Sequence, residues 1–507
     1  MKKYSQEEIN NILWQACDTF RGKIDSAIYK DYILVMLFIK YVSDMFKETK
    51  QKLMEQFNNN VEMVERQLRY ERFVLDEKCT FDYLYEKRST PDIGATINKA
   101  LAEIEDINKG KLRGVFKNID FNSEPMLGST KERNALLKNL LEDFNKLDLR
   151  PSRLIGNDII GDAYEYLINK FASDAGKKGG EFFTPPQVSE LLARLVKPEE
   201  NDRIYDPTCG SGSLLLRAYK QVPNGKAQIY GQERNGQTHS LARMNMFLHD
   251  ADDAKIEWGD TLSNPLHLEN DKLMKFQVIV ANPPFSLDKW DMGFSGDSND
   301  RSFRMEAALD KYGRFDWGVP PRSKGDYAFV LHMLHSLAEG GRMGVVLPHG
   351  VLFRGSSEGR IRKQILDLNL LDAVIGLPAN LFFGTSIPAC IMIFKQNRVK
   401  KDVLFIDASG EEYYEKGKNQ NILRDEDIKK IVDVYQKYNT IDKFSYVASI
   451  EEIIENDYNL NIPRYVDTFE EEELVDMDEV KENIEKIQKE IKEVEGQMKK
   501  YLDELGL

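Results

Sequence analysis

From about residue 155, short apolar runs alternate with stretches whose apolar residues recur at helical spacing. Because parallel strands are joined by crossover helices, this alternation predicts an α/β fold in which helices cover both faces of a mostly parallel sheet. The predicted strands are Arg203–Asp206, Gln228–Gly231, Lys255–Trp258, Gln277–Ala281, Met343–Pro348, Leu371–Gly376 and Cys390–Phe394. Sheets of this kind bind ligands at the carboxyl ends of their strands, near a switch in strand order. The residues that directly follow these strands are therefore the first candidates for a functional site.

The first 155 residues have a different pattern, which is helical throughout. Glycine and proline are sparse there, and apolar residues repeat at helical spacing within a strongly apolar segment. These are Ile24, Ile28, Tyr32, Val35, Ile39 and Val42. We expect residues 1–155 to form a helical packing domain without chemistry of its own, followed by a catalytic α/β domain over residues 156–465.

Residues 466–507 are predicted to form an acidic linker and a C-terminal helical tail. After the linker, apolar residues alternate four-three spacing over nearly four heptads, which is a coiled-coil seam. The seam consists of Val480, Ile484, Ile487, Ile491, Val494, Met498, Tyr501 and Leu505. Such a narrow apolar face needs a partner. The helix either folds back on its own domain or docks on another subunit, and the second alternative is favoured.

The net charge of the 507-residue chain is 70 − 84 = −14, which argues against tight, autonomous binding to nucleic acid. If DNA is the substrate, a partner is expected to supply much of the basic surface. No apolar run reaches the roughly 18 residues that span a bilayer, and the N-terminus lacks a signal-peptide pattern. Four widely spaced cysteines match no metal site and indicate reduced thiols. We therefore expect a cytoplasmic protein with no membrane contact and no metal.

The segment Asp206-Pro207-Thr208-Cys209-Gly210-Ser211-Gly212 directly follows the first predicted strand. Its two glycines permit a tight turn and a close approach of a ligand to the backbone. A helix that begins near Ser213 would present its N-terminal amides to the same place. The segment lacks the third glycine of a dinucleotide fingerprint and the Lys-Ser/Thr of a P-loop, so a pyrophosphate ligand is disfavoured. A ligand with a carboxylate, such as the methionine part of S-adenosylmethionine, fits better.

Two acidic residues follow the next two strands. Glu233 lies about 20 residues past the glycine turn, where an acidic side chain commonly binds ribose hydroxyls. Asp260, in Gly259-Asp260-Thr261-Leu262, is well placed to accept a hydrogen bond from an adenine amino group. Capping of a helix is the competing role for an Asp in such a turn.

The segment Gly179–Pro186 precedes the first strand, and its helix, Gln187–Val196, is expected to pack beside the glycine turn. Glu181, Phe183 and Thr184 are candidate contacts to a cofactor that this segment closes over. The alternative for Phe183 and Thr184 is a simple loop and N-cap, because Thr before Pro at the first helical position is a common helix start.

The fourth strand is followed by Asn282-Pro283-Pro284-Phe285, which is a weak pattern alone but the most informative feature of the chain beside the other motifs. Prolines fix φ and remove backbone donors, so the carbonyl groups here stay free to accept hydrogen bonds. An amino group on a planar base needs such acceptors, together with an aromatic face on which the base can stack. These four residues are therefore the candidate catalytic residues.

A basic group follows the strand that ends at Pro348. It comprises Arg354, Arg360, Arg362 and Lys363. A helix with a solvated basic face is the simpler interpretation, and phosphate contact at the rim of a DNA cleft is the alternative. His349 has no neighbours in the sequence that form a triad or a metal set with it, so we expect a structural role.

The order of these segments resembles that of amino-methyltransferases in which the cofactor motifs precede the catalytic one. More closely, the chain resembles the modification (M, HsdM-type) subunit of Type I restriction-modification systems over nearly its full length. The supporting segments are Leu13 to Gly22, Tyr29 to Asp44, Gly161 to Ile168, Gly384 to Pro388 and Asn456 to Ile462. This resemblance implies a Rossmann-like sheet that uses S-adenosylmethionine as its cofactor.

The resemblance also implies roles for individual residues. Phe183 and Thr184 would line the cofactor pocket, and Asp206, Gly210 and Gly212 would hold the methionine portion of the cofactor. Further cofactor-binding candidates are Glu181, Thr208, Ser213 and Asn282. Glu233 would bind the ribose, and Asp260 the adenine of the cofactor. Asn282 and the Pro283 carbonyl would accept hydrogen bonds from the N6 amino group of a target adenine, beside Pro284, while Phe285 would stack on the base.

The implied reaction is transfer of a methyl group to N6 of an adenine that has left the DNA duplex, because N6 is unreachable inside the stack. The implied partners are DNA, a separate specificity subunit docked through the C-terminal helix, and a second M subunit; a restriction subunit can be added. Two alternatives stay open. One is a glutamine or RNA amino group as the substrate, and the other is a scaffold with a vestigial fold.

Overall fold

The computed structural model describes residues 3–21, 26–112, 114–156, 158–175, 183–295, 302–383, 385–468 and 477–505. The candidate residue Glu181 lies outside these ranges, as does Gly384. The chain divides into two compact units, Met1–Val466 and Asp467–Leu507. No helix among the described residues is long and apolar enough to cross a membrane.

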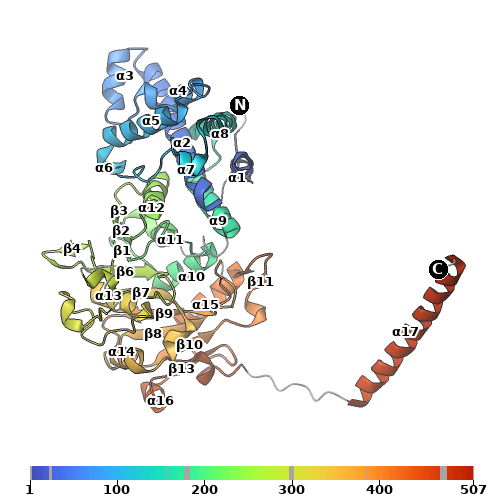
Figure 1. The fold of residues 1–507 in the computed structure, drawn as a ribbon. Helices are drawn as coiled ribbons and strands as arrows, with labels where there is room; N and C mark the ends of the chain where they lie inside the picture. The colour runs from blue at the N-terminus through green and yellow to red at the C-terminus, as the bar shows by residue number, and fades with distance from the viewer. Residues whose placement is uncertain are drawn as a thin grey trace. The chain divides into compact units, whose positions relative to one another are not determined.

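The N-terminal part of the first unit is helical, as predicted (Figure 1). Its helices are α1 Gln6–Ala16, α2 Ser26–Gln56, α3 Val61–Leu68, α4 Phe81–Glu86, α5 Ile93–Ile107, α6 Lys109–Leu112, α7 Glu124–Leu127, α8 Thr130–Asn145 and α9 Ile159–Ala175. One hydrophobic cluster joins these helices and also takes in Leu241, Met244 and Phe247 from α12 (Gly236–Leu248). The apolar core of the helical region therefore continues past residue 155 and onto one helix of the α/β region.

Nine strands among the described residues form one sheet in the order β13-β10-β8-β9-β7-β6-β1-β2-β3. Their bounds are β1 Arg203–Asp206, β2 Gln228–Glu233, β3 Lys255–Trp258, β6 Phe276–Ala281, β7 Leu337–Pro348, β8 Leu371–Gly376, β9 Ala389–Lys395, β10 Val403–Asp407 and β13 Ser445–Ala448. Strands β6, β1, β2 and β3 pair in parallel, and β7 is parallel to β6. Strand β9 runs antiparallel between β7 and β8, and β13 is antiparallel to β10.

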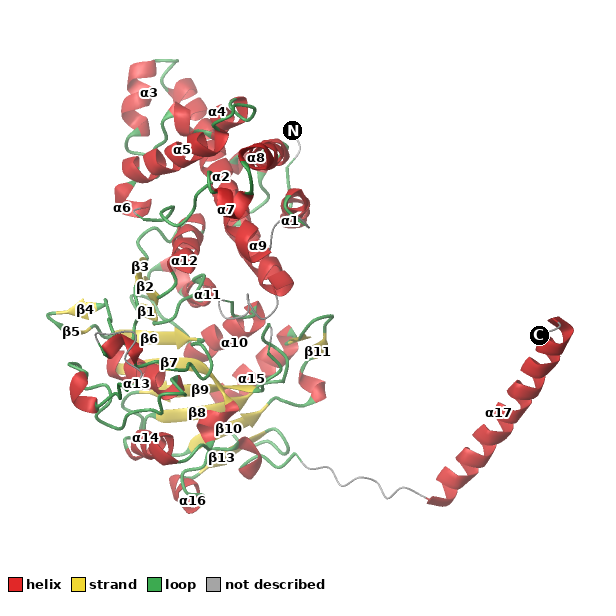
Figure 2. Cartoon of the chain, in the orientation of Figure 1, coloured by secondary structure: helices red, strands yellow, loops and turns green. Residues whose placement is uncertain are grey.

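Apolar side chains alternate between the two faces of the sheet. On β6, Ile279 joins one buried cluster, whereas Val278 and Val280 join the other. Both faces are covered by helices, as the pattern of strands and helices predicts (Figure 2). These helices are α10 Pro186–Val196, α11 Ser213–Lys220, α12, α13 Asp326–Ser336, α14 Ser356–Asp367, α15 Asp425–Lys437 and α16 Ile450–Glu455.

All seven predicted strands are present, and three have the predicted bounds. Strands β10 and β13 were not predicted. Two short hairpins were not predicted either, β4–β5 (Leu268–Glu269 and Lys272–Leu273) and β11–β12 (Glu415–Lys416 and Asn421–Ile422). Strand β13 is only four residues long and its central residues are half-buried. Pairing with β10, rather than a strong local pattern, makes this segment a strand.

The second unit contains α17, Met477–Leu505. The described side chains of the heptad seam are about half exposed, from 49% at Ile484 to 63% at Val494. The side chains of Val480, Tyr501 and Leu505 lie outside the described part. Within this unit the seam thus leaves an apolar stripe open.

Candidate active site

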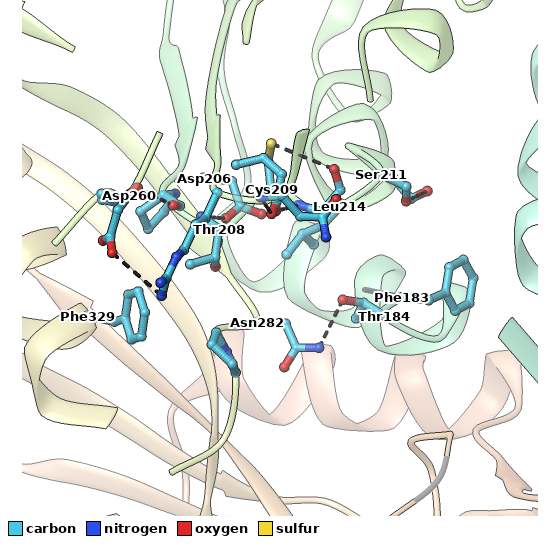
Figure 3. Close-up of a pocket in the computed structure, with 18 of the residues that line it drawn as sticks. Phe183, Thr184, Asp206, Thr208, Cys209, Ser211, Leu214, Asp260, Asn282 and Phe329 are labelled. Atoms are coloured by element: carbon cyan, nitrogen blue, oxygen red, sulfur yellow. Dashed lines mark hydrogen bonds and ion pairs between the residues drawn. The ribbon is translucent and has the colours of Figure 1, made fainter. Parts of the chain in front are cut away.

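A cavity of about 410 Å³ lies where β1, β2, β3 and β6 end. Figure 3 shows that its walls come from segments far apart in the sequence. Ten of the predicted site residues line it: Phe183, Thr184, Asp206, Thr208, Gly210, Ser213, Glu233, Asp260, Asn282 and Pro284. Gly212, Pro283 and Phe285 are not part of the lining. The carboxyl edge of the sheet therefore brings together most of the residues that the sequence analysis selected.

The glycine turn after β1 needs its glycines for two different reasons. Gly210 and Gly212 have φ angles of +54° and +80°, in the left-handed region that favours glycine. The backbone N–H of Gly210 donates to the Glu233 carboxylate over 3.0 Å, which ties the turn to the end of β2. A Cβ on Gly212 would lie 2.5 Å from the Sδ-methyl carbon of Met246 on α12, so Gly212 permits close helix packing rather than lining the cavity.

Two buried carboxylates face the cavity. Asp206 is 2% exposed and accepts a hydrogen bond of 2.8 Å from the Thr208 N–H. Burial raises the pKa of Asp206 to about 7, and the nearby Glu233 charge adds to the rise, against the Thr208 hydrogen bond. Burial also raises the pKa of Glu233, which accepts hydrogen bonds from Gly210 and Asn235. Two such carboxylates favour a ligand that carries positive charge.

Asp260 follows β3 and uses its two carboxylate oxygens differently. Oδ1 accepts from the N–H of Leu262 over 2.9 Å, which is the capping type of contact. Oδ2 lies 3.7 Å from a guanidinium nitrogen of Arg234, whose side chain is 71% exposed. The turn geometry that competes with ligand binding is therefore present, yet Asp260 still lines the cavity.

Asn282 has one satisfied and one unsatisfied polar atom. Its Nδ2 donates to Thr184 Oγ1 over 3.0 Å (Figure 3). Its Oδ1 is buried and accepts no hydrogen bond from the described residues. Helix α10 has Pro185 as its N-cap, without a side-chain cap, so the interpretation of Thr184 as a helix cap is wrong. The Thr184 hydroxyl instead joins the segment before β1 to the segment after β6.

Phe285 lies beside the cavity rather than in its lining. Its ring is half-buried and packs edge-on against Phe382, with 5.7 Å between ring centroids and 69° between planes. Phe183 packs against Phe383 in the same loop, at 5.8 Å. The loop before β9 thus supports two predicted site residues through adjacent phenylalanines, which the sequence analysis had not selected.

The basic group after β7 differs from its prediction as a solvated face. Arg362 is 4% exposed and donates to the backbone oxygens of Val351, Arg354 and Tyr458. Arg354 forms ion pairs with two buried carboxylates. The solvated-face interpretation is wrong for these two arginines, because they have internal partners. His349 contacts the Ala389 carbonyl, which agrees with a structural role.

Several residues that line the cavity carried no functional signal in the sequence. Phe329 lies on α13 within an entirely apolar stretch, so its place in the wall depends on how α13 packs (Figure 3). Arg234 directly follows the predicted site residue Glu233, and Leu287 lies two residues after Phe285. Both could therefore have been found from the sequence. The remaining unpredicted lining residues are Pro207, Cys209, Ser211, Leu214, Asn235, Gly259 and Thr261.

One of the two clusters of possible metal ligands among the described residues lies at the start of α9. It consists of Asp158, Asp162 and His249. The Lys220 ammonium lies 2.7 Å from Asp158 and 3.1 Å from Asp162. A lysine that already neutralises these carboxylates makes a cation there unfavourable.

Comparisons with known proteins agree with this geometry. Residues 155–474 match the family described as N-6 DNA Methylase, and residues 9–144 match the HsdM N-terminal domain. The Type I restriction enzyme MpnII methylase subunit of Mycoplasma pneumoniae is 33% identical, over 100% of this chain and 98% of its own length. The chain belongs to the methylase subunits of Type I restriction enzymes. It is therefore an adenine-specific DNA methyltransferase that acts on N6, of enzyme class 2.1.1.72.

Two further methylase subunits support this assignment. The MjaVIII methylase subunit of Methanocaldococcus jannaschii is 33% identical, over 100% of this chain and 86% of its own length. The crystal structure of the Type I restriction-modification methyltransferase subunit from Streptococcus thermophilus is 36% identical, with a TM-score of 0.77 over 92% of this chain and 100% of that one. The resemblance and the fold class inferred from the sequence are thereby confirmed.

Proposed function

We propose that the cavity binds S-adenosylmethionine and that the Asn282–Phe285 turn presents the N6 amino group of a DNA adenine to it. The unpartnered, buried Oδ1 of Asn282 is the observation that carries this proposal. A buried acceptor without a donor is costly, so the site is suited to a ligand that brings an N–H group. S-adenosylmethionine is the cofactor of this methyltransferase family.

The cavity residues suit the parts of this cofactor. Asp206 and Glu233 offer negative charge to its amino and sulfonium groups and acceptors to its ribose hydroxyls. The free N–H groups at the start of α11 suit its carboxylate. Asp260 is in a position to accept from the adenine amino group of the cofactor. When bound, the cofactor supplies an electrophilic methyl group on a sulfonium.

The protein's contribution to transfer is positioning and polarisation. The lone pair of N6 is delocalised into the adenine ring and is a poor nucleophile. Asn282 Oδ1 and the Pro283 carbonyl would accept its two hydrogens and draw the nitrogen toward tetrahedral geometry, which frees the lone pair. With the amino group held by these two acceptors, the new N–C bond would form as the S–C bond breaks, and N6 would then lose a proton to solvent. Positioning and preorganised dipoles account for most of the acceleration.

The target base must leave the duplex before it reaches this turn. Phe285 would then stack on the base, compensating for lost stacking on the order of 1–3 kcal/mol. The edge-on contact with Phe382 supports the half-buried Phe285 ring.

We also propose that a separate specificity subunit docks on the apolar seam of α17, that two copies of this chain join one such subunit, and that a restriction subunit can be added. The exposed seam residues and the net charge of −14 support a partner that reads DNA. A cytoplasmic location agrees with this function and remains a prediction.

The first test is methyl transfer from labelled S-adenosylmethionine to DNA, with the chain alone and with its specificity subunit. Formation of N6-methyladenine only with the partner would support the chemistry and the division of labour. Cofactor binding without N6-methyladenine under either condition would favour a glutamine or RNA amino group as the substrate. Absence of cofactor binding by calorimetry would favour the scaffold alternative.

The docking proposal has its own test. Ile491→Asp is expected to abolish co-purification with the specificity subunit, because it places a charge in the seam. Lys489→Asp lies on the opposite side of α17 and is the matched control. Equal retention of the partner by both variants would exclude the seam as the docking surface.

A further inference from the structure

The chain that leaves the Asn282–Phe285 turn enters an unusual conformation at Ser286. Its φ angle is +53°, in the left-handed region that non-glycine residues rarely adopt. The Ser286 N–H donates to Asp326 Oδ1 over 2.7 Å. Asp326 is the first residue of α13, forty residues further along the chain. A tertiary contact, rather than local preference, therefore sustains the backbone directly after Phe285.

Backbone contacts extend this connection. The Gly325 N–H donates to the Leu287 carbonyl over 3.0 Å, and the Lys289 N–H donates to the Arg322 carbonyl over 2.8 Å. A Cβ on Gly325 would lie 3.0 Å from Cβ of Trp290, so the two segments approach as closely as a glycine allows. The segment after the catalytic turn is thus bound to the segment before α13.

The charge of Asp326 is balanced inside the protein. Its carboxylate is 1% exposed, and Arg354 donates to Oδ2 over 2.6 Å. The same guanidinium pairs with the buried Glu358 of α14 through two hydrogen bonds, of 2.5 and 3.0 Å. A Cβ on Gly350 would lie 2.9 Å from Arg354 Nη1, so Gly350 leaves room for this arginine. Arg354, whose side chain is 23% exposed, therefore acts as an internal counter-ion for Asp326 and Glu358.

We propose that Asp326 is a positioning residue for methyl transfer, which holds the Asn282–Phe285 turn in its productive geometry through the Ser286 N–H. This inference rests on the proposed function of that turn. The same helix places Phe329 in the cavity wall one turn after Asp326. Helix α13 thereby sets the position of the cavity wall and of the catalytic turn relative to each other.

The test compares kcat with cofactor affinity in the full chain, under the conditions in which the wild type methylates DNA. Asp326→Ala removes the acceptor, and kcat is expected to fall about 100-fold, the loss associated with misplacing a reacting group by about 1 Å. The Kd for S-adenosylmethionine is expected to stay unchanged, because Asp326 does not line the cavity. Asp326→Asn keeps an oxygen acceptor for Ser286 and is expected to recover most of the lost kcat.

Asp44 provides a matched control in the helical region. Its carboxylate is also buried, pairs with Lys40 over 2.7 Å and accepts from the distant Leu149 N–H over 2.7 Å. Asp44→Ala is expected to lower Tm as much as Asp326→Ala does, while kcat per folded molecule stays that of the wild type. The proposal is overturned if Asp326→Ala retains wild-type kcat, if Asp326→Asn is as slow as Asp326→Ala, or if Asp44→Ala loses kcat in step with its Tm.

The failure of this inference is distinguishable from failure of the proposed function. Asn282→Ala in the same assay must lower the rate of transfer by about 100- to 1000-fold if the turn is catalytic. Loss of transfer in Asn282→Ala together with normal kcat in Asp326→Ala would overturn only the positioning role. Normal transfer in Asn282→Ala would overturn the proposed function itself.

Discussion

The helical region and the cavity at the edge of the sheet both bury carboxylates, but the hydrogen-bond and ion-pair partners of these carboxylates differ. Burial raises the pKa of Asp44 and of Asp206. Asp44 has a lysine and a backbone N–H as partners. Asp206 accepts only from Thr208, and no cation of the described residues forms an ion pair with it. An unpaired buried charge is destabilising, so the lack of an ion-pair partner for Asp206 agrees with the proposed binding of a cationic ligand in the cavity.

Buried amides show the same difference. Asn108 in the helical region accepts from the Val74 N–H over 3.1 Å and donates to the carbonyls of Val74 and Ile104. Asn282 donates to Thr184, but its oxygen has no donor among the described residues. The contacts of Asn108 are those of a structural residue, whereas the open oxygen of Asn282 agrees with its proposed role as an acceptor for a substrate amino group.

The largest effect is expected from Asn282→Ala, which removes the unpartnered acceptor. Loss of one preorganised polar group at a reacting centre costs about 100- to 1000-fold in rate. Calorimetry should show that S-adenosylmethionine still binds, and circular dichroism that the fold is retained. Wild-type rates of N6-methyladenine formation in this variant would exclude polarisation by Asn282.

The next largest effect is expected on the affinity for the cofactor. Asp206→Asn keeps the acceptor for Thr208 but removes the charge, so the Kd for S-adenosylmethionine is expected to weaken about 10- to 100-fold, or roughly 1.5–3 kcal/mol. Without cofactor, the variant should have a higher Tm than the wild type at pH 8. In the wild type the buried Asp206 carboxyl is ionised at that pH, which is destabilising, whereas an asparagine stays neutral. Asp44→Asn should lower Tm, because Lys40 loses its partner. If Asp206→Asn and Asp44→Asn both raised Tm, or both lowered it, the proposed difference between the two carboxylates would be contradicted.

A change of pH is expected to have a smaller effect on stability and on cofactor affinity. The pKa of Asp206 in the fold, about 7, lies above its ordinary value of 3.8. Its contribution to stability is therefore fully present below about 3.8 and is lost as the pH rises through about 7. The cationic cofactor prefers the ionised form, so its affinity should rise with pH up to about 7 and then level off, with proton release on binding below pH 7.

Titration calorimetry in buffers of different ionisation enthalpy measures that proton release directly. Asp206→Asn serves as the control, since it cannot release the proton. A wild-type affinity that is constant from pH 5.5 to pH 8.5 would remove Asp206 from the set of cofactor ligands.

The smallest effect on activity is expected from Asn108→Ala. This change leaves part-buried backbone groups of Val74 without partners, so unfolding should require roughly 1–3 kcal/mol less free energy. Methyl transfer per folded molecule should match the wild type. Denaturant titration and the methylation assay together test the claim that complete polar groups in the helical region are structural.

Strands β1, β2 and β6 were predictable because each is a largely buried run, followed or ended by a residue type typical of a turn or of a ligand contact. Arg203–Asp206, Lys255–Trp258 and Leu371–Gly376 have the predicted bounds. The contribution of Phe329 was not predictable, because an aromatic residue in an apolar helix has the same local pattern whether it packs in a core or lines a cavity. The internal pairing of Arg354 with Asp326 was hidden for the same reason, since a sequence does not show which buried carboxylate a basic residue meets.

The amino-acid sequence by itself determined the α/β fold, the helical N-terminal region, the family and the set of segments that gather at the carboxyl edge of the sheet. These follow from local periodicity and from short motifs, which need no knowledge of distant contacts. Only the tertiary structure decided which of the gathered polar atoms lack partners, where Phe285 packs, and that Asp326 accepts a hydrogen bond from the backbone directly after the Asn282–Phe285 turn. Such features depend on contacts between residues that are 40 to 100 positions apart, and no local pattern encodes them.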